Sequence, residues 1–250
     1  MPKTIKSYLS SVCSLHVNAG LPFECCKSPT VQHLIRGIKH LYGEKACTQK
    51  LPITLAIVQR LSAVSGDLGI RDNANFDAAV KLAWAGFLQC GEYTVANSQS
   101  FNPAIHLTRS SVKFIPNIEE PTHIHLTLPS SKTDPFRKGV SIFVAKALAS
   151  KESTCAVLAL KHLFGNHPQP SGSPLFTDGT GFPLTRNSFI SLLKLRLAAI
   201  GLDQSLYSGH SFCRSMASSA AAVGYSDYEI QLLGWWCSDA CGLYIDVPVD

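Results

Sequence analysis

The sequence lacks an apolar run of the roughly 18 uninterrupted residues that would indicate a membrane-spanning helix. Its first residues, 1–6, also lack the apolar core of a secretory signal peptide. Internal repeats and low-complexity tracts are absent, and a composition of 46% hydrophobic and 16% charged residues is typical of a globular protein. We therefore expect a protein of the nucleus or cytoplasm with no membrane partner.

The nine cysteines include no C-x-x-C pair, which is the spacing most typical of zinc sites. An intracellular chain keeps its thiols reduced, so these cysteines are predicted to be free and no metal site is expected. The formal net charge of +5 makes the chain mildly basic. This balance permits a nucleic-acid partner without demanding one.

Hydrophobic periodicity predicts a mainly α fold that carries a small antiparallel β-sheet (α+β). Helices are expected at residues 5–19, 30–42, 54–65, 76–87, 154–165, 185–200, 210–223 and 226–234. Strands are expected at residues 112–115, 123–128 and 139–144. A polar, proline-containing stretch at 44–52 is predicted to link two domains, one at 1–50 and one at 51–250.

Five short segments in the second domain contain residue types that suggest chemistry. They are Gly-Phe-Leu-Gln-Cys-Gly-Glu (86–92), Leu-Pro-Ser-Ser-Lys-Thr-Asp (128–134), Gly-His-Ser-Phe (209–212), Leu-Gly-Trp-Trp (233–236) and Leu-Tyr-Ile (243–245). In this order they resemble the boxes of the tyrosine recombinase (phage integrase) family. The wording is closest to the Crypton and DIRS-type recombinases of eukaryotic transposons. Residues 5–51 are similar to the later part of the helical core-binding (SAM-like) domain of that family.

The resemblance implies DNA recombination and integration on double-stranded DNA, by homo-oligomers and without a cofactor or metal. Family members attack a phosphodiester with a tyrosine, which gives a 3′-phosphotyrosine link. Carried over by position, Tyr244 would be the nucleophile, Lys132 the hairpin lysine that protonates the leaving oxygen, and His210 the histidine. Trp235 occupies a position that is histidine or tryptophan in many members. Two family arginines would neutralise the phosphoryl group in the transition state.

Both arginine positions are replaced in this sequence, by Gln89 and Cys213. Arg214 follows directly, but one helical residue rotates a side chain by about 100°, so we expect it to point away from the phosphate. Related proteins commonly have arginine also where Cys13 and Trp235 stand. Because arginine codons of the CGN type become Cys, Gln or Trp codons by C-to-T changes, we hypothesise a decaying copy of a transposable element.

Three interpretations remain open, and they leave open whether the chain is an enzyme. The first is a DNA-binding protein with impaired catalysis, the second a working recombinase with a substitute cation such as Arg214. The third is an interaction module that no longer binds DNA. Several basic residues favour the first interpretation over the third, because they could contact DNA phosphates. They are Lys113, Arg137, Lys138, Arg186, Lys194, Arg196 and Arg214.

Overall fold

A computed structural model describes residues 2–43, 50–64, 69–130 and 139–234 of the chain. Its contacts divide the chain into two compact units, Met1–Gln49 and Lys50–Asp250. The division falls close to the domain boundary that the polar stretch at 44–52 suggests.

The first unit is built from three helices, α1 (Pro2–Asn18), α2 (Glu24–Lys27) and α3 (Pro29–Tyr42). The chain turns after α1 at Gly20, which has a φ of 66°, a left-handed conformation that glycine adopts readily. Ser28 caps α3 by accepting a hydrogen bond from the Val31 N–H. The expected helices at 5–19 and 30–42 are thus present, and the four-residue α2 lies between them.

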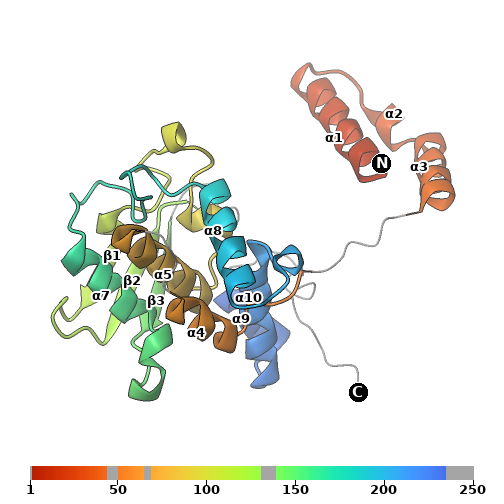
Figure 1. The fold of residues 1–250 in the computed structure, drawn as a ribbon. Helices are drawn as coiled ribbons and strands as arrows, with labels where there is room; N and C mark the ends of the chain where they lie inside the picture. The colour runs from red at the N-terminus through yellow and green to blue at the C-terminus, as the bar shows by residue number, and fades with distance from the viewer. Residues whose placement is uncertain (1, 44–49, 65–68, 131–138, 235–250) are drawn as a thin grey trace. The chain divides into compact units, whose positions relative to one another are not determined.

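The helices of the second unit alternate with irregular segments and one small sheet. The α-helices are α4 (Leu55–Ala63), α5 (Ile70–Ala85), α6 (Cys90–Tyr93), α7 (Ala156–Asn166), α8 (Arg186–Ala199), α9 (His210–Ala222) and α10 (Asp227–Leu233). Short 3₁₀ turns are η1 (Ser98–Ser100), η2 (Arg109–Ser111), η3 (Ala149–Thr154) and η4 (Gln204–Leu206). Helix α5 lies in the middle of this unit, where it contacts α4, α7 and α9 (Figure 1).

The sheet consists of three antiparallel strands in the order β1-β2-β3, with β1 at Val112–Ile115, β2 at His123–Leu128 and β3 at Val140–Ala145. Leu126 of β2 lies between Val112 of β1 and Ile142 of β3. These side chains are buried, as the period-2 pattern predicts for a sheet with one covered face. The prediction of a mainly α fold with a small antiparallel sheet is confirmed.

A buried aromatic cluster joins the helices that surround the candidate site. Phe189 of α8 has its ring centroid 5.6 Å from that of Phe76 in α5, 5.1 Å from Tyr93 in α6 and 5.9 Å from Phe212 in α9. All four rings are at most 5% exposed. Aromatic pairs at these separations each stabilise a fold by about 0.5–1.5 kcal/mol, in addition to the stabilisation from the apolar area that they bury. The cluster therefore fixes the starts of α6, α8 and α9 relative to one another.

Within the described ranges, no helix combines the length and the apolar character that crossing a bilayer requires.

Candidate functional site

The site begins where the chain reverses direction between α5 and α6. Helix α5 ends at Ala85, and the N–H of the C-cap residue Gly86 donates to the Leu82 carbonyl at 2.9 Å. The next residue, Phe87, has a φ of 54°, which is uncommon for a residue other than glycine. A side chain at Gly86 would meet the Leu82 carbonyl oxygen at 3.0 Å, so the turn leaves little room there. This tight reversal places Gln89 at the beginning of α6.

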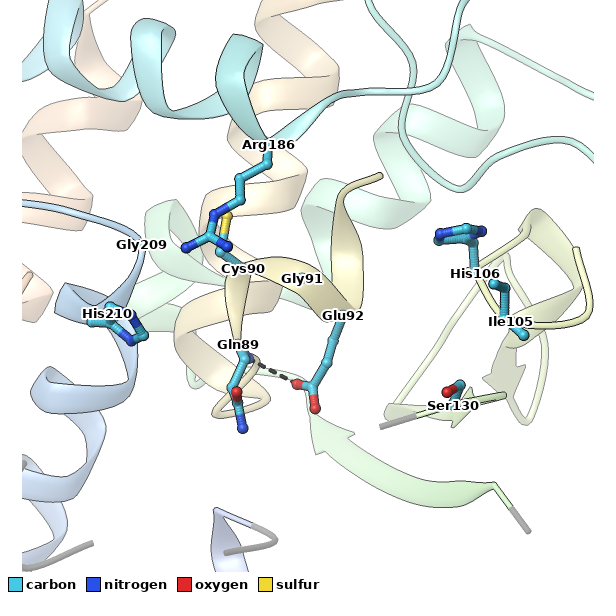
Figure 2. Close-up of a pocket in the computed structure, with 10 residues that line it drawn as sticks. All are labelled: Gln89, Cys90, Gly91, Glu92, Ile105, His106, Ser130, Arg186, Gly209 and His210. Atoms are coloured by element: carbon cyan, nitrogen blue, oxygen red, sulfur yellow. Dashed lines mark hydrogen bonds between the residues drawn. The ribbon is translucent and has the colours of Figure 1, made fainter. Parts of the chain in front are cut away.

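Gln89 is held by Glu92, three residues further along. The Glu92 carboxylate accepts a hydrogen bond from the Gln89 N–H at 2.8 Å, and the Glu92 N–H donates to the Gln89 carbonyl at 2.8 Å. This reciprocal arrangement is half of a capping box and closes the first turn of α6. The side chain of Gln89 is partly exposed and faces a hollow in the surface (Figure 2).

Gly209 brings the start of α9 against α6. A Cβ atom at this glycine would lie 2.8 Å from Cβ of Cys90, a separation that real side chains do not tolerate. Only glycine permits this approach, which sets His210 beside Gln89 (Figure 2). The His210 N–H donates to the Ser208 hydroxyl at 3.3 Å, at the first turn of α9. Two residues that lie far apart in the sequence, and that the resemblance assigns to one site, therefore meet.

The hollow has a volume of about 480 Å³, and five segments form its walls. Figure 2 shows Gln89 and His210 on one side of it and the loop with His106 on the other, while Arg186 extends from the start of α8 toward Cys90. The described residues that line it are Gln89, Cys90, Gly91, Glu92, Ile105, His106, Ser130, Arg186, Gly209 and His210.

Cys213 lies in the interior behind this hollow. Its thiol is directed at backbone carbonyls, 3.6 Å from that of Leu88 and 4.0 Å from that of Phe87, and the residue is 2% exposed. Burial, together with the negative charge of Glu92, raises the pKa of the Cys213 thiol to about 12. The thiol is therefore neutral near pH 7 and cannot neutralise a phosphate.

Arg214 is also buried, at 7% exposed, and is not among the described residues that line the hollow. The neighbouring Ser215 packs inward as well, where its hydroxyl accepts a hydrogen bond from Nε1 of Trp84 at 3.3 Å. This placement agrees with the expectation that Arg214 does not take over the position of Cys213, and it does not favour Arg214 as a contact to DNA.

The prediction that Arg196 contacts a DNA phosphate is not supported, because Arg196 is an interior residue and not a surface cation. Its guanidinium donates to the Val64 carbonyl at 2.7 Å and also to Oδ1 of Asn73, and it lies 4.7 Å from the centre of the Phe76 ring. At 3% exposed, it presents almost no surface to a phosphate. The arginine instead joins the end of α8 to α4 and α5.

The other predicted residues fall into three groups. Arg186 lines the hollow, whereas Lys113 on β1 and Lys194 on α8 are exposed but lie outside it. Lys132, Arg137, Lys138, Trp235 and Tyr244 lie outside the described residues.

The sequence did not predict that Ile105 and His106 line the hollow. Nδ1 of His106 lies 3.0 Å from the Asn102 nitrogen, and its ring stacks on Phe101 with centroids 5.8 Å apart. The segment is an irregular loop between η1 and η2, where no periodic pattern indicates which side chains face the site. Nothing in the sequence spacing could have selected His106.

Two side chains of opposite charge, Arg186 and Glu92, line the hollow. Arg186 is the only permanently charged cation among the described residues that line the hollow. Burial raises the pKa of the Cys90 thiol, while the hydroxyl of Thr94 and the charge of Arg186 act in the opposite direction. Burial likewise raises the pKa of Tyr93 well above its usual value. These two groups stay neutral, so the walls offer one guanidinium, the Gln89 amide and two imidazoles to an anion.

Neither a family model nor a curated protein matches this sequence. Solved structures do match. XerA recombinase has a TM-score of 0.55 at 16% identity, over 100% of this chain and 79% of that one. The Tn1549 transposon integrase, in complex with a circular-intermediate DNA, has a TM-score of 0.56 at 13% identity, over 96% and 81% of the two chains.

The XerH site-specific recombinase, in a post-cleavage complex with its difH substrate, has a TM-score of 0.55 at 12% identity. The match covers 83% of this chain, which spans only 51% of the XerH chain. At such low identities the likeness concerns the fold alone. It confirms the resemblance on which the five sequence segments agree: this chain has the fold of the tyrosine recombinases.

Proposed function

We propose that this chain is a DNA-binding protein of the tyrosine recombinase type, derived from a mobile element, whose strand-cleavage step is impaired. One observation carries the proposal: within a tyrosine recombinase fold, the positions that the resemblance assigns to one catalytic site, Gln89 and His210, line the same hollow. If the sequence segments resembled the family by chance, Gln89 and His210 would not be expected to line one hollow.

The proposed roles follow the resemblance. Tyr244 attacks the scissile phosphodiester, Lys132 protonates the leaving oxygen, and His210 orients the phosphate or handles the proton of the tyrosine. Trp235 stands at the family position that is histidine or tryptophan in many members. Homo-oligomers assemble on duplex DNA during the reaction, which takes place in the nucleus or cytoplasm, and neither a metal nor a cofactor takes part.

Impairment follows from the charges at two positions. Removing one preorganised donor to a developing oxyanion typically lowers the rate by about 10²–10³. Gln89 keeps a neutral hydrogen-bond donor at the hollow, which is about half as strong as a charge-assisted one. Cys213 keeps none, because its neutral thiol is buried against the carbonyls of Phe87 and Leu88. The chain would therefore bind a phosphate more readily than it would cleave next to one.

The origin as a decaying Crypton- or DIRS-like copy accounts for the identity of the replacements. Positions 13, 89, 213 and 235 hold Cys, Gln, Cys and Trp, which are the residues that single C-to-T changes on either strand would make from CGN arginine codons. Sequencing sibling copies in the same genome tests this. Arginine at these positions in the siblings supports decay, whereas the same Cys, Gln and Trp throughout contradicts it.

Binding to duplex DNA as a function of salt concentration tests the central part of the proposal. Neutralised phosphates release counterions, so the logarithm of the binding constant should fall linearly with the logarithm of the salt concentration, with a slope of about −0.9 per phosphate contact. A flat dependence, or no binding at low salt, would instead favour an interaction module without DNA affinity.

A further inference from the structure

The hollow at Gln89 adjoins a second one, and Arg186 lies between them. The second hollow has a volume of about 340 Å³ and is lined by Arg186, Asn187, Ile190, Ser191, Ser208, Gly209 and His210. Arg186, Gly209 and His210 belong to both sets, so they form the ridge that separates the two hollows. The lining of the second hollow is polar except for Ile190 and contains no acidic residue among those described.

The side chain of Arg186 is positioned for a ligand rather than for the interior. Its backbone N–H donates to the Val95 carbonyl at 2.9 Å, and the N-cap Thr185 fixes the first turn of α8 through the Ser188 N–H at 3.1 Å. The guanidinium, in contrast, makes no hydrogen bond and no ion pair with any described residue, and the residue is exposed. The backbone is thus fixed while the charged end has its five donors available.

Arg196, ten residues later on α8, shows what a structural arginine looks like in this fold. It is 3% exposed. Its guanidinium donates hydrogen bonds to the Val64 carbonyl and to Asn73, and it lies over the face of the Phe76 ring. Arg186 has none of these contacts. A structural role for its charge therefore lacks support.

A phosphate is the ligand that this ridge fits best. A planar guanidinium binds phosphate oxygens through two parallel hydrogen bonds, and the hydroxyls and amides around it add neutral donors. The carboxylate of Glu92 is the acidic group that lines the first hollow, and it is already engaged with the Gln89 N–H. That contact directs the carboxylate to the backbone of Gln89, whereas Arg186 extends from the start of α8 toward Cys90 (Figure 2).

We propose that Arg186 is the phosphate-binding cation of this site, holding one backbone phosphate at the ridge while the strand continues from one hollow into the other. The inference rests on the proposed function, since it names the residue through which DNA is held. It also explains how affinity for DNA can persist when positions 89 and 213 are neutral. Arg186 acts as a binding and positioning residue, not as a replacement for the missing pair.

The experiment has two parts, both on the full chain. In the first, the ¹⁵N-labelled protein is titrated with the thymidine trinucleotide, which carries two phosphodiesters, and the arginine Nε–H signals are followed. The signal of Arg186, identified by its loss in Arg186→Lys, should shift and saturate, while that of the interior Arg196 should stay in place. An unmoved Arg186 signal, or equal shifts of all arginine signals, overturns the inference.

In the second part, the salt dependence of duplex binding is measured for the unmodified chain, Arg186→Ala and Lys151→Ala. Lys151 is exposed on η3, lines neither hollow and provides a control for the loss of one positive charge. Arg186→Ala should weaken binding about tenfold and reduce the salt slope by about 0.9, while Lys151→Ala should stay within about twofold. Equal losses in both variants overturn the role of Arg186 but leave the proposed function standing.

If the unmodified chain shows no salt-dependent binding to duplex DNA, the proposed function is wrong, and the trinucleotide titration alone decides the role of Arg186. Thermal melting of each variant checks its fold, because Arg186→Ala keeps the backbone contact to Val95 and should melt with the unmodified chain.

Discussion

Gln89 and Cys213 stand at the two positions where the resemblance expects arginine, yet their surroundings differ sharply. Gln89 is partly exposed at the edge of a hollow of about 480 Å³, at the first turn of a short helix. Cys213 is 2% exposed inside α9, with its thiol against two backbone carbonyls. The first position has room for an arginine, whereas the second is closely packed. An arginine at position 89 can therefore extend into the hollow, whereas an arginine at position 213 must displace packed side chains.

The largest expected effect comes from the aromatic cluster that holds both positions in place. Phe189→Ala removes a fully buried ring that contacts Phe76, Tyr93 and Phe212, and should lower the free energy of unfolding by about 3–5 kcal/mol. Phe182→Ala is the control, because that ring is 60% exposed and should change stability by no more than about 0.5 kcal/mol. Urea unfolding measures both. Equal effects would mean that the cluster does not position the site.

The next largest effect is the loss of stability expected when arginine replaces Cys213, compared with arginine in place of Gln89. Cys213→Arg forces a long side chain into a packed interior and should lower the free energy of unfolding by about 1–3 kcal/mol. The carbonyls of Phe87 and Leu88 can accept hydrogen bonds from the new guanidinium, which limits the loss. Gln89→Arg extends into the hollow and should stay within about 0.5 kcal/mol. Similar losses for the two variants would show that the difference in burial has no energetic consequence.

A smaller effect should appear in the pH dependence of stability. Burial raises the pKa of the folded Cys213 thiol to about 12 from an ordinary 9.0, so the unfolded chain releases this proton at a lower pH than the folded chain does. The thiol's contribution is complete below pH 9 and falls as the pH rises from 9 toward 12. At pH 10 the unmodified chain should have lost about 1 kcal/mol more than Cys213→Ala, relative to pH 8. Parallel pH profiles for the two proteins would contradict the burial of this thiol.

Some features of the site could be predicted from the sequence because they follow periodic or ordered patterns. The alternating strands at 112–115 and 123–128 are found where the period of two places them. The meeting of Gln89 with His210 followed from the order of the sequence boxes and not from any local pattern. Gly209 then supplies the physical reason, since its missing side chain allows α9 to approach Cys90.

Other features depended on contacts that the sequence does not encode locally. Arg186 and Arg196 lie on one helix and both were expected to contact DNA, but only Arg186 faces the hollow. A signal did exist for Arg196, because it follows the buried Phe189 by seven residues and therefore lies on the same face of α8. His106 had no such signal, because an irregular loop carries it to the site.

The most direct test of the account is covalent trapping on a suicide DNA substrate, with the unmodified chain beside the double variant Gln89→Arg/Cys213→Arg. The expected loss of stability at position 213 is small enough, at about 1–3 kcal/mol, for a typical domain to remain folded. The unmodified chain should form no covalent complex, and the double variant should form one that disappears when Tyr244→Phe is added. An abundant complex with the unmodified chain, abolished by Tyr244→Phe, would contradict it.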